Sequence, residues 1–139
     1  MYSRILWIIP IVVVLLAGCG GPSDQLNPAI GEKFMLSIGQ SASIKGENLV
    51  VRFVEVVGDS RCPQDVTCIW AGEATSLIEI TFSGNTYQKA LTQPGLTEPP
   101  QTDFQNYLIM FDLQPYPRAN VTTEKKDYRL QLEFQKKSG

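Results

Sequence analysis

Both cysteines that could pair with each other lie in one segment, Gly58-Asp59-Ser60-Arg61-Cys62-Pro63-Gln64-Asp65-Val66-Thr67-Cys68-Ile69-Trp70-Ala71-Gly72-Glu73-Ala74. On both sides it is flanked by runs of β-branched and apolar residues, which is typical of β-strands. The stretch itself contains Pro, Gly and charged residues, which interrupt strands. It also holds two cysteines in the spacing C-x5-C. We therefore expect a connection between two strands that is closed by a covalent bond.

Cys62 and Cys68 are expected to form that bond. The chain has three cysteines, and Cys19 belongs to the N-terminal region considered below, which leaves an even pair. Closing so short a loop restricts the unfolded chain by about 2.4 kcal/mol in the entropic model. A redox pair or a metal site is the alternative. The spacing fits neither the C-x-x-C of thiol oxidoreductases nor the paired C-x-x-C of zinc sites, so a structural disulfide is preferred.

On the two sides of this segment, about seven segments are predicted to be strands. Beyond the N-terminal region, no segment has a convincing helical period of apolar residues. Arg52 and Glu55 lie three positions apart, so they fall on opposite faces of a regular strand unless a bulge intervenes. Ser83-Gly84-Asn85 predicts a tight hairpin. The alternation after Asp127 places one set of apolar side chains on a common face. The predicted strands are residues 34–38, 42–44, 49–57, 75–82, 86–91, 107–113 and 127–134.

This pattern predicts an all-β fold, with a single antiparallel two-sheet β-sandwich of about seven strands. A partly closed β-barrel is the alternative. The Pro-containing segment from Thr92 to Asn106 is expected to be a crossover between sheets or an exposed loop.

The N-terminus carries the pattern of an export signal. Arg4 precedes an apolar run from Ile5 to Leu16, which is shorter than the roughly 18 to 20 residues of a transmembrane helix. The following Leu16-Ala17-Gly18-Cys19 resembles the lipobox of bacterial lipoproteins. An ordinary signal peptide, or an uncleaved anchor with an incidental Cys, is the alternative.

The lipobox resemblance implies three parts of the chain. Residues 1–18 would be a signal peptide that is removed, residues 19–31 a lipidated Cys19 with a flexible tether, and residues 32–139 the β-sandwich domain. The acylated Cys19 would hold the protein on a lipid bilayer of the bacterial cell envelope, on the extracytoplasmic side.

The central stretch also resembles a family. Its residues fit the pattern D-S-R-C-P-x-x-V-x-C-x-W-A-G-x-A of small bacterial secreted and lipoprotein β-domains, and Pro115-Tyr116-Pro117 and Tyr128 look similar to such proteins as well. Most of these domains have no known function. The resemblance therefore implies an exported β-domain without implying an activity.

The residues of the central stretch have a structural and a functional interpretation. Structurally, Asp59 and Ser60 bond nearby backbone, Arg61 pairs with an acidic neighbour, and Trp70 packs against the disulfide or the sandwich edge. The residues assigned to the structural loop are Asp59, Ser60, Pro63, Gly72 and Glu73. Functionally, Arg61 and Trp70 form an exposed pair of the kind that dominates protein interfaces. The candidate binding residues are Arg61, Gln64, Asp65 and Trp70.

Composition bounds the function classes. The chain contains no His, and no nucleophile, phosphate-loop or dinucleotide motif is found, so an enzyme is not expected and a hydrolase ranks last. A formal net charge of −2 without a basic block argues against nucleic-acid binding. Asp59, Asp65 and Glu73 lack the spacing of a calcium loop, so neither a metal site nor a cofactor is expected.

The leading hypothesis is a lipid-anchored binding module that contacts a protein or ligand, such as an envelope protein, through the Cys62–Cys68 loop and the Pro-rich segment from Gly95 to Pro100. The alternative is a structural or assembly accessory of the cell envelope in which this loop only holds the fold together.

Overall fold

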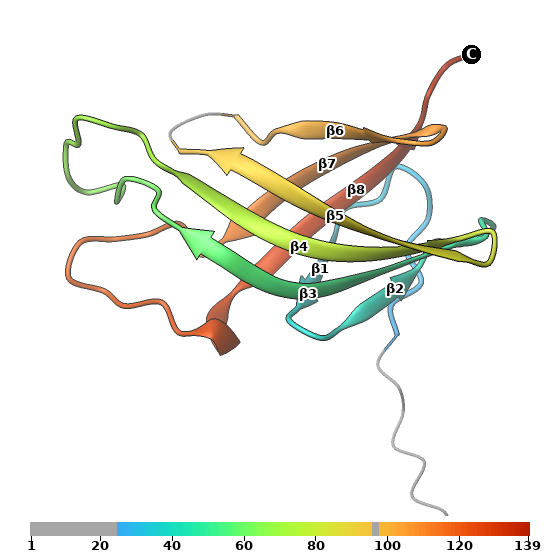
Figure 1. Cartoon of the computed structure of the whole chain (residues 1–139), viewed down its shortest axis with the longest axis horizontal. Helices are drawn as coiled ribbons and strands as arrows, with labels where there is room; N and C mark the ends of the chain where they lie inside the picture. Colours follow the sequence, from blue (N-terminus) through green and yellow to red (C-terminus); the bar gives the residue numbers. More distant parts are fainter. Residues whose placement is uncertain (1–24, 96–97) are drawn as a thin grey trace, which may run out of the picture.

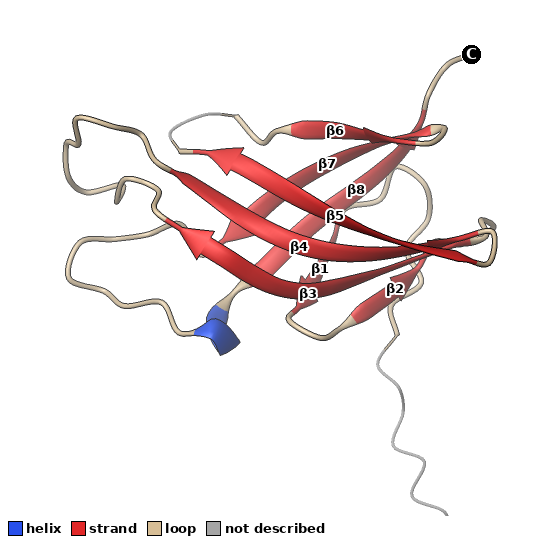
Figure 2. Ribbon diagram, viewed as in Figure 1, coloured by secondary structure: helices blue, strands red, loops and turns tan. Residues whose placement is uncertain are grey.

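A computed structural model of the chain describes residues 25–95 and 98–139. These residues form two antiparallel sheets of four strands each, packed face to face (Figures 1 and 2). A short 3-10 turn, η1 (Lys125–Asp127), precedes the last strand. The strands are β1 (Phe34–Ser37), β2 (Ser41–Ser43), β3 (Leu49–Asp59), β4 (Glu73–Phe82), β5 (Asn85–Pro94), β6 (Gln101–Phe104), β7 (Tyr107–Gln114) and β8 (Arg129–Lys136).

One sheet has the strand order β2-β3-β4-β5 and the other the order β1-β8-β7-β6. The predicted two-sheet sandwich is confirmed, and the alternative of a partly closed barrel is wrong because the two sheets stay separate. The chain changes sheets between β5 and β6, so the segment after Thr92 is a crossover, which is one of the two possibilities that the sequence left open.

The segment after the crossover contains a strand that the sequence pattern did not indicate. β6 pairs with β7 from Gln101↔Met110 to Phe104↔Tyr107. β6 has four residues and lies at the edge of its sheet. Exposed positions alternate along it with partly buried positions. A strand this short and polar forms because it pairs with the neighbouring strand. The local amino-acid composition gives no sign of that pairing.

The hairpin predicted at Ser83-Gly84-Asn85 is confirmed, since β4 and β5 pair in register down to Phe82↔Asn85. Ser83 and Gly84 both adopt positive φ, 48° and 82°. Two such residues in succession give the turn whose twist matches that of the flanking strands.

A bulge lies between Arg52 and Glu55, which is the exception that the sequence pattern left open. Phe53 pairs with Ile78 and Glu55 with Leu77, so Val54 is an extra residue in β3. The extra residue changes the alternation, and both charged side chains are consequently exposed.

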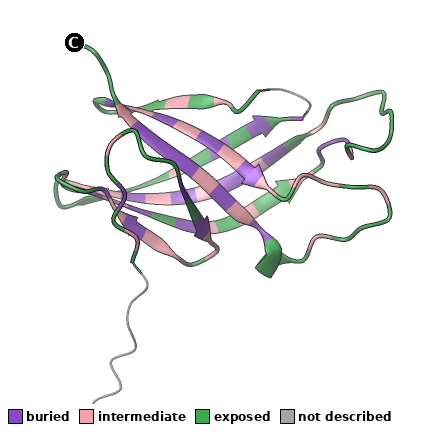
Figure 3. Cartoon of the chain, turned by 180° about the vertical axis from the view of Figure 1, so that it is seen from behind, coloured by how far each residue is buried: buried purple, intermediate pink, exposed green. Residues whose placement is uncertain are grey.

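The core lies between the sheets and is built from the inward positions of the strands. Buried and exposed positions alternate along the strands, whereas the connections are mainly exposed (Figure 3). The predicted alternation in the C-terminal strand is confirmed, because its four apolar positions are all buried. They are Tyr128, Leu130, Leu132 and Phe134.

The residues just before β1 are attached to the sandwich, which corrects the expected domain boundary at residue 32. Leu26 forms a parallel bridge with Ala42, and the Lys45 backbone N–H donates to the Pro28 carbonyl at 2.8 Å. Leu26 and Ile30 also pack against the core, and this apolar burial outweighs the flexible composition of the segment. The packed domain therefore includes the segment from Leu26 onward. The predicted signal peptide at residues 1–18 and lipidation at Cys19 lie outside the described residues.

Within the part of the chain that the structure describes, we find no helix of sufficient length and apolar character to cross a membrane.

Candidate functional site

The connection between β3 and β4, here called the Cys loop (residues 60–72), begins as a continuation of the strand ladder. The Ser60 backbone N–H donates to the Glu73 carbonyl at 2.8 Å, and the Cys62 N–H donates to the Ala71 carbonyl at 2.8 Å. The predicted disulfide between Cys62 and Cys68 is present, with the two Cα atoms 5.9 Å apart. Backbone pairing and a covalent bond therefore close the loop together.

Ser60 fixes the base of the Cys loop with its side chain as well. Its Oγ donates to the Glu73 carbonyl at 3.1 Å and accepts from the Glu73 N–H at 3.2 Å. Opposite it, Gly72 has φ +67°, and a Cβ atom there would lie 1.8 Å from the Ser60 carbonyl oxygen. The structural interpretation of Ser60 and Gly72 is thus supported by their contacts, and Glu73 contributes through its backbone.

Arg61 belongs to the Cys loop, and its side chain is buried. Its guanidinium bonds several acceptors at once, and this set of contacts is called the Arg61 clamp. Its Nε and Nη2 donate to the two carboxylate oxygens of Asp59 at 2.8 and 2.7 Å, and the two side chains are 0% and 6% exposed. Its Nη1 and Nη2 also donate to the carbonyls of Leu113 and Pro115 at 2.7 and 3.1 Å. The guanidinium carbon lies 4.5 Å from the centroid of the Tyr116 ring. One side chain therefore joins the Cys loop to the end of β7 and to the chain that follows it.

The surroundings of Asp59 hold the pKa of its carboxyl below the ordinary value. Burial by itself raises the pKa of the carboxyl, but hydrogen bonds and charge from Arg61, with a further bond from the Tyr128 hydroxyl, outweigh burial and lower the pKa. A carboxylate with a lowered pKa stabilises the fold above its unfolded pKa of about 3.9, and that contribution is lost as the pH falls through the folded value.

We expect the free energy of unfolding of the wild type to fall from pH 5 to pH 2, and to fall less in Asp59→Asn, which cannot titrate. Urea denaturation at several pH values in this range measures both slopes. Other carboxylates contribute equally to both proteins, so the difference between the slopes isolates Asp59. Equal slopes would contradict the role assigned to its carboxylate.

Gln64 and Asp65 attach the far side of the Cys loop to the segment between β7 and β8. The Gln64 N–H donates to the Pro117 carbonyl at 3.0 Å, and Asp65 Oδ1 accepts from the Ala119 N–H at 2.7 Å. Figure 1 shows this segment and the Cys loop at the same end of the sandwich. The bond of Asp65 therefore reaches a segment 54 residues further along the chain.

The apolar residues at the outer part of the loop point to solvent. Ile69 is 93% exposed, Trp70 83% and Val66 45%; these three residues are called the tip. The interpretation in which Trp70 packs against the disulfide or the sandwich edge is wrong. The expected exposed pair is also wrong in one member, because Arg61 is buried and only Trp70 is exposed. Ile69, which the sequence analysis did not select, is the most exposed member of the tip.

Beside the loop lies a cavity of about 430 Å³, called here the end cavity. Its polar lining comes from the Cys loop, from both sheets and from the segment after β7. The position of this cavity was not predicted, and of its lining residues only Gln64 was named as a candidate binding residue from the sequence, because the residues are far apart along the chain. The polar lining residues are Gln64, Gln93, Asp112, Gln114, Tyr116 and Arg118.

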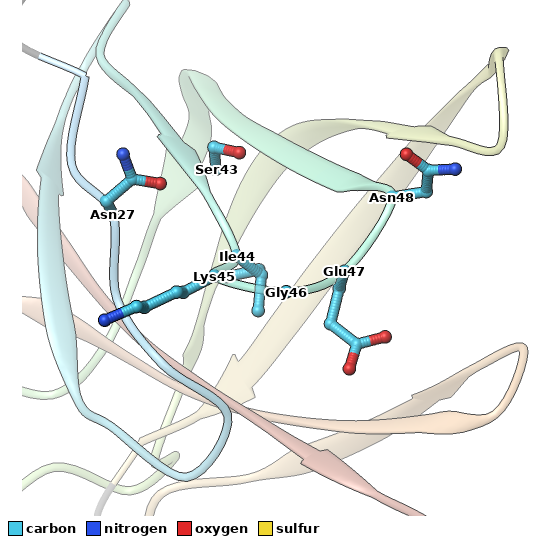
Figure 4. Close-up of a pocket in the computed structure, with 7 residues that line it drawn as sticks. All are labelled: Asn27, Ser43, Ile44, Lys45, Gly46, Glu47 and Asn48. Carbon is cyan, nitrogen blue, oxygen red and sulfur yellow. The ribbon is translucent and has the colours of Figure 1, made fainter.

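A larger cavity, of about 710 Å³, lies beside the turn between β2 and β3 (Figure 4). The side chains of Lys45 and Glu47 point in different directions there. Glu47 is already engaged, since its carboxylate accepts from the Tyr107 hydroxyl and pairs with Lys136 Nζ, each at 2.6 Å. This cavity consequently offers fewer convergent polar groups than the end cavity.

In residues 25–95 and 98–139 no group of three or more His, Cys, Asp or Glu side chains is placed to hold a metal ion. Of the acidic residues considered for calcium, Asp59 is committed to Arg61, and Asp65 to a backbone N–H.

In comparisons with known proteins, no family model, no curated protein and no solved structure matches this chain.

Proposed function

We propose that this protein is a lipid-anchored, extracytoplasmic binding module of the bacterial cell envelope, and that it contacts a protein partner through the tip of the Cys loop. The observation that carries the proposal is the exposure of Trp70 and Ile69, 83% and 93%, on a loop that is firmly attached to the fold. Burying such side chains at an interface removes apolar area from water.

The way the loop is held supports the proposal. The tip is fastened by the Cys62–Cys68 disulfide and by the bond of Asp65 to Ala119. A partner that binds a preorganised loop does not bear the entropy cost of ordering it. Trp is also among the residues that contribute most binding energy when they are buried at an interface.

The position of the N-terminal segment is compatible with anchoring through Cys19. The first described segment lies beside β2, where Leu26 bridges Ala42, on the side of the molecule away from the Cys loop (Figure 1). An acyl group on Cys19 would attach the protein to a bilayer from that side. The tip would then be free to face a partner.

The test is site-specific photo-crosslinking in cells of the source organism, with the reactive side chain at Ile69 so that Trp70 is retained. A matched control carries the same group at Gln88, an exposed position on β5. We expect a discrete crosslinked protein from position 69 and none from position 88. The same products from both positions, or none from either in a folded and exported protein, would contradict the proposal.

Replacing Trp70 with Ala separates this proposal from a purely structural role of the loop. Because the ring is exposed, we expect the free energy of unfolding to change by less than about 0.5 kcal/mol. The yield of the crosslink at position 69 should nevertheless fall by about 30-fold, as for an interface residue worth 2 kcal/mol. A large loss of stability in urea denaturation, with the crosslink retained, would favour the structural accessory.

A further inference from the structure

The end cavity has a polar floor that is already arranged for a ligand. Gln93 is 2% exposed. Its Oε1 accepts from the Leu113 backbone N–H at 2.7 Å, and its Nε2 donates to Asp112 Oδ1 at 2.7 Å. The Gln114 amide donates to the other oxygen of the same carboxylate. Two amides thus hold Asp112 in one orientation, so a ligand would not have to order these side chains.

The rest of the lining includes three ring-bearing side chains. They are Tyr116, Pro99 and Pro115. The Tyr116 ring is held by Arg61, whose guanidinium carbon is 4.5 Å from the ring centroid. Aromatic and proline rings of this kind offer surfaces on which the C–H groups of a flat ligand can pack.

The volume of about 430 Å³ lies within the range of about 300 to 1,000 Å³ that is usual for small-molecule sites. The chemistry of the lining selects among ligand classes. A wholly apolar ligand would strip water from the Asp112 carboxylate and the Gln amides without replacing their hydrogen bonds. A phosphate or another multivalent anion would be repelled by the negative charge of the Asp112 carboxylate. Arg118 is the one cationic side chain in the lining that could offset this repulsion.

Hydroxyl groups fit the same lining well. A hydroxyl both donates and accepts, which suits a carboxylate that only accepts and amides that do both. We propose that the end cavity binds a saccharide. The hydroxyls of the saccharide bond Asp112 and the amides of Gln93 and Gln114. The C–H face of the sugar ring packs on Tyr116. Arg118 lies at the same site. This inference does not depend on the tip, because none of the tip residues lines the cavity.

The test uses the full chain in a polyoxyethylene detergent, which carries no sugar head group. Maltotriose, cellotriose and triacetylchitotriose are titrated separately, and amide chemical shifts are followed by NMR. We expect at least one of them to bind with a Kd of about 1 mM or tighter. The shifts should map to the residues of the end cavity.

Two variants and two controls locate the site. Asp112→Asn preserves the shape of the carboxylate, and Gln114→Ala removes one amide; each should weaken binding at least ten-fold. Gln88→Ala removes an amide from an exposed position on β5 and should leave the Kd unchanged. Trp70→Ala should leave it unchanged as well, so failure of the saccharide site and failure of the tip are distinguishable.

Several results would overturn the proposal. They are the absence of binding by all three saccharides at about 10 mM, an unaltered Kd in both cavity variants, and shifts that map elsewhere. Inorganic phosphate and triglycine are titrated in parallel. Saturable binding of either one in the end cavity, without binding of a saccharide, would assign the cavity to an anion or a peptide instead.

Discussion

Replacing Arg61 with Ala is expected to lower the free energy of unfolding by about 3 to 5 kcal/mol, the usual loss when one partner of a buried ion pair is removed. The variant would leave the Asp59 carboxylate, only 6% exposed, without its cation. It would also remove the donors to the carbonyls of Leu113 and Pro115. Urea denaturation followed by far-UV circular dichroism measures the loss.

Two further variants make this result specific. Arg61→Lys keeps the charge but cannot reproduce a forked set of donors, so it should recover only part of the lost stability. Lys126→Ala breaks an ion pair with Glu124 in which the side chains are 75% and 62% exposed. That control should change stability by less than about 1 kcal/mol. An Arg61→Ala protein that is no less stable than the Lys126→Ala control would show that the clamp does not support the fold.

Replacing Gly72 with Ala is expected to cost about 3 kcal/mol or more, because two unfavourable effects act at one position. The φ of +67° is costly for any residue with a Cβ, and the added atom would lie 1.8 Å from a backbone oxygen, that of Ser60. Backbone cannot move aside as a flexible side chain can. Relief would therefore require the ladder to open, with loss of the bond from Ser60 to Glu73 and the bond from Gly95 N–H to the Gly72 carbonyl.

The chain provides two matched controls for this prediction. Gly84 has φ +82° but open space around the position of a Cβ, so Gly84→Ala should cost only about 1 to 2 kcal/mol for the left-handed backbone. Gly58 has neither a positive φ nor a close neighbour, so Gly58→Ala should be close to neutral. The three changes in the free energy of unfolding are compared under one set of conditions. If Gly72→Ala costs no more than Gly84→Ala, the close approach to Ser60 is not what requires glycine.

Local patterns were sufficient for much of the sandwich. The alternation from Tyr128 to Phe134 and the Ser83-Gly84 turn both follow from the geometry of a strand and its nearest neighbours. The disulfide between Cys62 and Cys68 was likewise predictable, because the spacing and the cysteine count left few other uses for the pair. β6 was not predicted, since a short polar edge strand forms only when β7 is beside it.

The site depended on contacts that no local pattern records. From the sequence, a packed Trp70 ring was the structural interpretation and an exposed ring the functional one, and Arg61 could pair with any of several acidic neighbours. Tertiary structure decided both. Arg61 is buried because carbonyls at Leu113 and Pro115, far along the chain, lie next to the Asp59 pair. Trp70 is exposed, whereas Gln64 and Asp65 of the same loop bond the segment after β7.

The amino-acid sequence was therefore enough to predict an all-β chain, its principal strands and turns, and the position of its cross-linked loop. Strands follow from alternation, turns from turn residues and the loop from cysteine spacing, and each of these patterns extends over only a few positions. Which loop residues are buried and which form the tip became clear only from the folded structure. The same is true of the contact between Gln93 of β5 and Asp112 of β7 in the end cavity. The physical reason is that burial and hydrogen bonding at this end are set by segments from both sheets, which are brought together only when the sandwich closes.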